Sequence, residues 1–93
     1  MKPYELVVII HPDLDDEAIN QAVDRIKEWI AKADGKVEKV DNWGKKRLSY
    51  AIQKQNEGIY FLFTITMPPD AITEFERNLI ILEPVMRHLI VAK

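Results

Sequence analysis

The 93-residue sequence has no cysteine and only three glycines and five prolines. Without cysteine, a disulfide scaffold, a thiolate zinc site, an iron–sulfur cluster and a cysteine nucleophile are all excluded. The 47% hydrophobic and 30% charged residues are typical of a globular domain. The apolar run Leu6–Ile10 is far too short for a membrane span or a secretion signal. We therefore expect a single domain over residues 1–93 without membrane contact, and the lack of cysteine fits a cytoplasmic location.

Residues with the spacing of a catalytic or metal site are also missing. His11 and His88 have no second histidine or carboxylate at ligand spacing, so each is expected to be a surface or half-buried side chain. The acids of residues 13–17 are expected to cap a helix rather than bind calcium, and they would repel phosphate at that point. No Gly-rich phosphate loop is present. We therefore expect no enzyme, no metal, no cofactor and no small-molecule ligand.

The net charge of −2 conceals a basic segment in the middle of the chain. Residues 36–55 hold six bases against two acids, whereas residues 1–35 hold four bases against eight acids and residues 56–93 three against five. Within a Debye length of about 8–10 Å a local patch matters more than the net charge. The basic segment is therefore a candidate polyanion contact, although a solvated edge strand rich in lysine has the same composition.

Hydrophobic periodicity predicts six elements. They are a strand Lys2–His11, a helix Asp13–Ala33, a strand Lys36–Gln53, a strand Ile59–Met67, a helix that Pro68 opens and Pro84 ends, and a strand Val85–Ala92. Gly35 is expected to end the first helix at the C′ position. Residues 53–58 are expected to form a hairpin turn. A bulge near Gly44 is expected because apolar residues change parity along the second strand.

The order strand-helix-strand-strand-helix-strand predicts an α+β, ferredoxin-like fold. Two right-handed crossovers give a four-stranded antiparallel sheet with both helices on one face and the first and third strands in the middle. The other face of the sheet has no helix to cover it. By alternation we assign to that face an apolar patch with one acid: Glu5, Val7, Ile9, Leu62, Leu89 and Val91.

The cost of burying an unpaired charge decides which residues of the last strand face outward. Arg87 shares a face with Leu89 and Val91, so that face is expected to be the outer one, with Met86 on the helix side. An exposed apolar patch of this kind usually marks an interface. Two functions remain open: a protein docks on the patch while the basic residues contact RNA, or the sheet face stacks single-stranded bases as in an RNA-recognition motif. Tyr60 is the one aromatic residue that the second function would use on the third strand.

The segment Trp43-Gly44-Lys45-Lys46-Arg47-Leu48-Ser49-Tyr50-Ala51-Ile52 resembles the signature of a known family. It is similar to the family of the sixth protein of the bacterial small ribosomal subunit: Gly, any residue, a base, a polar residue, Leu, Ser or Ala, Tyr, any residue, Ile. The resemblance extends over the whole chain in one register, through Tyr4-Glu5, residues 37–40, Gly58-Ile59-Tyr60, Met67-Pro68 and Arg87.

This resemblance implies a structural, RNA-binding protein of the ribosome. Family members bind 16S-type ribosomal RNA in its central domain as a heterodimer with the eighteenth small-subunit protein. The implied RNA-binding residues are the bases of the motif and three lesser candidates, namely Lys45, Lys46, Arg47, Lys2, Lys54 and Arg87. The apolar patch is then the surface for the partner protein. Phosphate contacts of this kind position a protein without reading sequence.

Two further expectations concern the basic strand itself. Leu48, Tyr50 and Ile52 are expected to anchor this strand in the core. For Arg47 the alternative to a phosphate contact is a surface ion pair with Glu5, Glu38 or Asp41.

Overall fold

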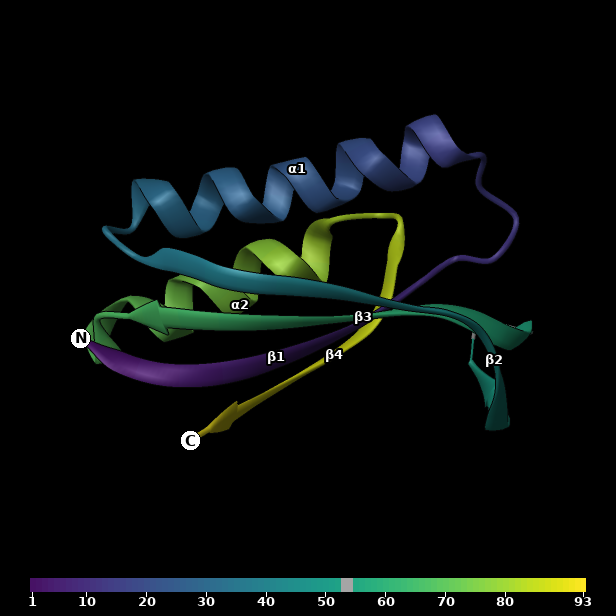
Figure 1. The fold of residues 1–93 in the computed structure, drawn as a ribbon. Helices are drawn as coiled ribbons and strands as arrows, with labels where there is room; N and C mark the ends of the chain where they lie inside the picture. The colour runs from purple at the N-terminus through teal and green to yellow at the C-terminus, as the bar shows by residue number, and fades with distance from the viewer. Residues whose placement is uncertain (53–54) are drawn as a thin grey trace.

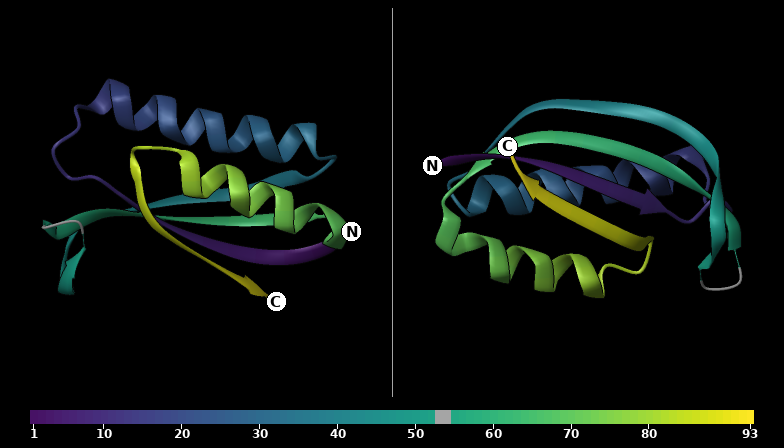
Figure 2. Two further views of the ribbon diagram at one scale, coloured as in Figure 1. Left: turned by 180° about the vertical axis from the view of Figure 1, so that it is seen from behind. Right: turned by 90° about the horizontal axis from the view of Figure 1, so that it is seen from below.

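The computed structural model describes residues 1–52 and 55–93, and for residues 49–52 it describes the backbone only. The elements are β1 (Lys2–Ile10), α1 (Asp16–Lys32), β2 (Lys36–Ile52), β3 (Gln55–Met67), a short 3₁₀ turn η1 (Pro69–Ala71), α2 (Ile72–Ile81) and β4 (Val85–Ala92). The sheet order is β2-β3-β1-β4, and all neighbours are antiparallel. Both helices lie on one side of the sheet (Figures 1 and 2). The predicted ferredoxin-like fold, with the first and third strands in the middle, is confirmed.

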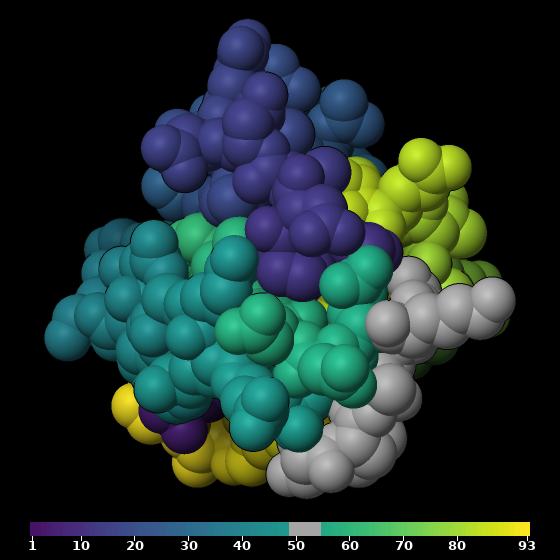
Figure 3. All heavy atoms as spheres, turned by 90° about the vertical axis from the view of Figure 1, so that its right-hand side faces the viewer, coloured from purple at the N-terminus to yellow at the C-terminus, as the bar shows by residue number. Residues whose placement is uncertain are grey.

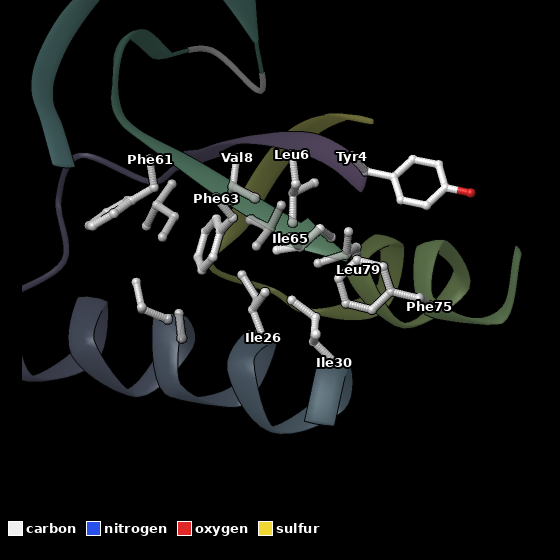
Figure 4. Packing of buried hydrophobic residues seen from close by; sticks show 14 of the residues in the cluster. Tyr4, Leu6, Val8, Ile26, Ile30, Phe61, Phe63, Ile65, Phe75 and Leu79 are labelled. Atoms are coloured by element: carbon white, nitrogen blue, oxygen red, sulfur yellow. The ribbon is translucent and has the colours of Figure 1, made fainter. Parts of the chain in front are cut away.

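The main core lies between the sheet and the two helices. Strict alternation in β3 turns every second residue toward the helices, and the buried ones are Phe61, Phe63, Ile65 and Met67. Figure 4 shows the side chains of β1 and β3 meeting Ile26 and Ile30 of α1 and Phe75 and Leu79 of α2. Each such side chain contributes about 1.5–3 kcal/mol on full burial. The helix layer is therefore fixed on this face, and the other face carries no helix of the described chain.

The first helix begins at a capping aspartate. Asp15 adopts extended backbone angles, and its Oδ1 accepts a hydrogen bond from the Ala18 amide at 2.9 Å. Asp16 and Glu17 follow in the first turn, where the helix dipole favours negative charge. The predicted role of these acids as caps is confirmed, and the helix starts three residues later than Asp13.

The first helix ends one residue earlier than expected. Asp34, not Gly35, takes the left-handed position with φ of 64°, a conformation that Asp tolerates better than most residues. The Gly35 amide donates to the Ile30 carbonyl at 2.8 Å and the Asp34 amide to the Ala31 carbonyl at 3.1 Å, which is a Schellman motif. Gly35 serves close packing instead, because a Cβ there would lie 2.8 Å from the Met67 Cγ atom.

The predicted bulge near Gly44 is present. Asn42 pairs with Phe61 and Gly44 pairs with Tyr60, so Trp43 is the extra residue of β2. Gly44 has φ of 79°, and its amide donates to the Asn42 Oδ1 atom at 2.8 Å. The left-handed backbone at this point explains the requirement for glycine.

Bulges turn Leu48 and Met86 to the side of the sheet opposite the helices. Leu48 follows the predicted bulge at Gly44, whereas Met86 is the extra residue of a bulge in β4 that alternation did not predict. The register of β2 also shifts between Val37 and Lys39, and that of β4 shifts opposite Ile9. Leu48, Met86 and Ile9 form a small separate cluster, against which Tyr60 packs. The expected burial of Leu48 is thus confirmed, but in this separate cluster rather than in the main core. The assignment of Met86 to the helix side was wrong.

β3 begins four residues earlier than expected. β3 begins at Gln55, and Arg47 pairs with Glu57, so most of the expected turn is strand. In Figure 1 the end of β2 turns away from the helix layer. Lys54 lies outside the described residues, as do the side chains of Tyr50 and Ile52, so the expectations for these three stay predictions.

Candidate functional site

The three cations of the motif occupy the hairpin end of β2. Lys45 pairs with Ile59, Lys46 with Gly58 and Arg47 with Glu57, and all three side chains are exposed. Within residues 1–52 and 55–93, none of the three cations forms a salt bridge. The alternative ion pair for Arg47 is therefore not formed with any of its proposed acids. Within the described residues, a polyanion would therefore not have to displace an acidic partner from any of these three cations.

Two other lysines of the basic segment, Lys36 and Lys39, precede the motif in β2 and have acidic partners. The Lys36 Nζ atom lies 3.9 Å from the Glu38 Oε2 atom, and the Lys39 Nζ atom lies 3.6 Å from the Asp41 Oδ1 atom. Lys39 pairs with Thr64, six residues along β3 from the partner of Lys46, or about 20 Å. Five of the six bases of the basic segment are described: three at the hairpin form no salt bridge within the described chain, and two lysines toward the opposite end of β2 are paired.

The lesser RNA candidates do not form one cluster with the motif. Lys2 is exposed but pairs with Met67, nine residues along β3 from Gly58, which is about 30 Å. Arg87 is exposed on β4 opposite Ile9, close to the hairpin end of the sheet. Of the two lesser candidates that the structure describes, Arg87 lies nearer to the motif.

The helix-free face presents the expected apolar row across three strands. Val7 pairs with Leu62 on one side and with Leu89 on the other, and Glu5 pairs with Val91. Val7 and Leu62 are half-buried, and Leu89 is 58% exposed. The right panel of Figure 2 looks onto this side of the sheet. We call Glu5, Val7, Leu62, Leu89 and Val91 the sheet-face patch.

Ile9 is not part of this accessible patch. It is only 8% exposed, because Leu48 and Met86 cover it. Gly58 also lies against it, since a Cβ at Gly58 would collide with the Ile9 Cγ2 atom. The same cluster half-buries Tyr60, the aromatic residue required by the base-stacking alternative. The hairpin therefore closes one end of the helix-free face and leaves the sheet-face patch open.

A surface groove separates the hairpin from the first turn of α1. Its volume is about 470 Å³, and its lining includes Asp16, Asn20, Asn42 and Lys45. Figure 3 looks onto this end of the molecule, where the start of α1 lies above β2 and β3. In the part of the chain that the structure describes, no three His, Asp or Glu side chains converge as a metal site would require. The groove therefore offers isolated polar contacts rather than a set of converging ligands.

Sequence reasoning did not anticipate two features near the candidate surfaces. Trp43, the bulge residue, is 46% exposed directly before the three cations. His88 is half-buried on the helix side, as expected, but its contact with α2 was not anticipated: its Nε2 atom lies 2.9 Å from the Glu76 Oε2 atom. The exposure of Trp43 could have been suspected from its place beside Gly44, because a bulge residue has no cross-strand partner.

No described helix combines the length and the apolar character needed to cross a bilayer. Among solved structures, the crystal structure of 30S ribosomal protein S6 from Thermotoga maritima matches this chain with a TM-score of 0.93 and 27% identity. The match covers 99% of this chain and 87% of that one. The C-terminal domain of the MgtC protein from Mycobacterium tuberculosis also matches, with a TM-score of 0.70 and 14% identity, which shows the fold alone.

Sequence comparison identifies the family. The model of the family "Ribosomal protein S6" matches residues 3–92. The small ribosomal subunit protein bS6 of Clostridium perfringens is 40% identical over 98% of this chain and 96% of its own length. That of Streptomyces griseus is 39% identical over 94% of this chain and 91% of its own length. The chain therefore belongs to the ribosomal protein S6 family and is a protein of the small ribosomal subunit.

Proposed function

We propose that this chain binds small-subunit ribosomal RNA of the 16S type, in its central domain, through Lys45, Lys46 and Arg47. The observation that carries this proposal is the exposed state of all three cations, unpaired within the described chain, at one end of a net-negative protein. They position the chain on phosphates and carry no sequence information. The cytoplasmic location expected from the sequence agrees with that of a ribosomal protein.

The charge distribution supports a local contact with a defined orientation. Asp16 in the first turn of α1 lines the groove opposite Lys45, so RNA phosphates are repelled there and attracted to the hairpin. Each phosphate that a cation neutralises releases condensed counterions, which lowers the logarithmic salt slope of binding by about 0.7 to 0.9. A protein of net charge −2 can therefore bind RNA through few contacts when a partner supplies further charge.

We further propose that the sheet-face patch docks the eighteenth small-subunit protein as a heterodimer partner. Val7, Leu62 and Leu89 form an apolar row with no described helix over it, and Leu89 and Val91 are largely exposed. Exposed apolar rows of this kind usually mark protein interfaces. RNA and partner then contact different parts of the chain, the hairpin and the sheet face.

The test is a salt series of RNA binding with and without the purified partner protein. Replacing Lys45 and Lys46 by Ala together is expected to flatten the slope of log K against log salt by about 0.7 to 0.9 for each lost contact. The loss arises because two phosphates keep their counterions. Equilibrium binding to a labelled central-domain RNA fragment, from low to physiological salt, measures this slope.

The matched control removes the same charge elsewhere on β2. Lys36 and Lys39 are already paired with acids, and they lie toward the opposite end of the strand. Their replacement by Ala is expected to leave the slope near that of the wild type. Equal slopes for the two double variants would remove Lys45 and Lys46 from the RNA contact.

The base-stacking alternative makes a different prediction for the same assay. If the sheet face stacked bases, the chain alone would bind single-stranded RNA, and Tyr60→Ala would weaken that binding. The half-buried position of Tyr60 against Ile9, Leu48 and Met86 argues against this alternative. We expect binding to require the partner, and we expect Tyr60→Ala to weaken it no more than Leu48→Ala, which loosens the same cluster without removing an aromatic face.

A further inference from the structure

Trp43 is exposed, and neither the proposed RNA contact through the three cations nor the sheet-face patch accounts for it. Large aromatic side chains bury 150–250 Å² in cores and interfaces, so one left in solvent on a strand is unusual. Trp43 is 46% exposed and belongs to neither cluster of buried side chains in the described chain. Trp29, the other tryptophan, is half-buried and packs against the main core. The two tryptophans therefore have different environments.

The backbone that carries Trp43 is fixed on both sides. Asn42 and Gly44 pair with successive residues of β3, and the Asn42 side chain accepts the Gly44 amide at 2.8 Å. The bulge thus presents the indole from a rigid strand rather than from a loop. A side chain presented in this way loses less conformational entropy when it binds.

The neighbours of Trp43 favour RNA over protein as the occupant. The three unpaired cations follow it by two to four residues, so their Cα atoms lie within about 14 Å along the strand. In the other direction β2 carries Asp41, an acid that pairs with Leu62 of the sheet-face patch, so the cations lie beyond Trp43 on the side away from that patch. An aromatic side chain beside unpaired cations is the arrangement that holds single-stranded nucleic acid, by stacking on a base while the cations contact phosphates.

We propose that Trp43 stacks on an unpaired nucleobase of the RNA strand whose phosphates Lys45, Lys46 and Arg47 contact. This inference rests on the proposed function and adds to it a class of ligand. The hairpin then binds a loop, bulge or single-stranded junction rather than a continuous duplex, since bases inside a helix are not available for stacking.

Stacking and phosphate contact can be distinguished because only the loss of a phosphate contact changes the salt dependence of binding. Trp43→Ala removes no charge, so it is expected to weaken RNA binding about tenfold or more while the salt slope stays that of the wild type. Trp43→Phe keeps an aromatic face and is expected to recover part of the affinity. Ile80→Ala is the matched control, because Ile80 is an exposed apolar residue on α2. Thermal unfolding confirms that each variant is folded.

Fluorescence gives a second measurement that does not depend on loss of affinity. In a Trp29→Phe protein, Trp43 is the sole tryptophan, and base stacking is expected to quench its emission when the central-domain RNA fragment is added to the complex with the partner. Quenching that saturates together with RNA binding supports the inference.

The possible outcomes distinguish this inference from the proposed function. If RNA binds with the expected salt slope while Trp43→Ala binds as tightly as the wild type and emission is unchanged, the stacking inference is wrong and the proposed function stands. A change in emission on addition of the partner protein alone, with none on RNA, makes Trp43 a protein contact and overturns the inference. Absence of RNA binding by the wild-type complex overturns both.

Discussion

Two glycines of this chain are required for different physical reasons, and substitution can tell them apart. Gly35 has negative φ, but a Cβ there would approach the Thr66 carbonyl oxygen and the Met67 side chain to 2.8 Å. Gly44 has φ of 79°, and a Cβ at that position would point into open space, with no neighbouring atom within 4 Å. The first position is limited by packing, and the second is limited by backbone conformation.

We therefore expect opposite rankings of Ala and Asn at the two positions. At Gly35, Ala costs about 1–3 kcal/mol by overpacking, and the larger Asn costs more. At Gly44, Ala costs about 1–2 kcal/mol by strain, and Asn costs less because it adopts the left-handed region more readily. Urea unfolding of the four variants measures these free energies. The same ranking at both positions would contradict the distinction.

Single residues were predictable from the sequence where they alternate without interruption. The face of Val7, Leu62 and Leu89 followed from a period of two, because no bulge lies between these residues and the middle of their strands. Met86 was assigned to the wrong side because the bulge in β4 reverses the alternation there, and no glycine in the sequence marks it. Gly44 did mark the bulge in β2, and that prediction was right.

At the scale of elements, the β2–β3 hairpin is attached to the sheet by very few buried side chains among those described. Leu48, Ile9 and Met86 are the buried members of its cluster, with Tyr60 half-buried against them. This cluster lies on the side opposite the helices, so the main core does not support it. The position of Lys45, Lys46 and Arg47, the proposed RNA contacts, relative to the sheet-face patch therefore depends on Leu48.

Leu48→Ala is expected to loosen this hairpin without unfolding the domain. Truncation of a buried leucine costs about 2–5 kcal/mol, and we expect the lower end because the cluster is small and close to the surface. Hydrogen exchange is expected to accelerate at the amides of the hairpin and to remain slow in the middle of β1. RNA affinity should fall although no charge is lost.

Leu79→Ala provides the matched comparison, since Leu79 is fully buried in the main core. The same chemical change there is expected to lower protection throughout the sheet. Uniform acceleration in Leu48→Ala as well would show that the hairpin is not a separate unit.

The cluster of Ile9, Leu48 and Met86 could not be predicted from alternation, because it depends on how two elements pack together. Leu48 was recognised as buried from its apolar character, but alternation could not show that the hairpin end covers Ile9. That contact depends on how far the twisted hairpin turns away from the helix layer, which is a property of the packed sheet. Ile9 was therefore placed in the accessible patch although the hairpin buries it.

At the scale of the whole molecule, the core, the cations and the exposed apolar row occupy different parts of the fold. The helices cover one face and complete the core, the hairpin end carries three cations without a salt bridge in the described chain, and the sheet-face patch remains open on the opposite face. The order of elements was sufficient to predict this layout, because a β-α-β-β-α-β chain with right-handed crossovers leaves one sheet face bare. An apolar row on that bare face is expected to need a partner.

Leu89→Glu tests this last expectation directly. A charge at a position 58% exposed in the free chain should change the unfolding free energy by no more than about 0.5 kcal/mol. In the complex the same carboxylate is buried without a partner, which costs about 3 kcal/mol or more and lowers affinity for the eighteenth small-subunit protein at least about 100-fold. Titration calorimetry with the purified partner measures this loss.

Ile80→Glu is the control for the effect of the added negative charge. Ile80 is 71% exposed on α2, on the layer opposite the sheet-face patch, so the same substitution there should leave partner affinity unchanged. If Leu89→Glu lowers affinity and Ile80→Glu does not, the loss cannot come from the added negative charge, which both variants carry. The partner then occupies the bare sheet face. Equal affinities for the two variants would place the partner elsewhere and leave the apolar row without a function.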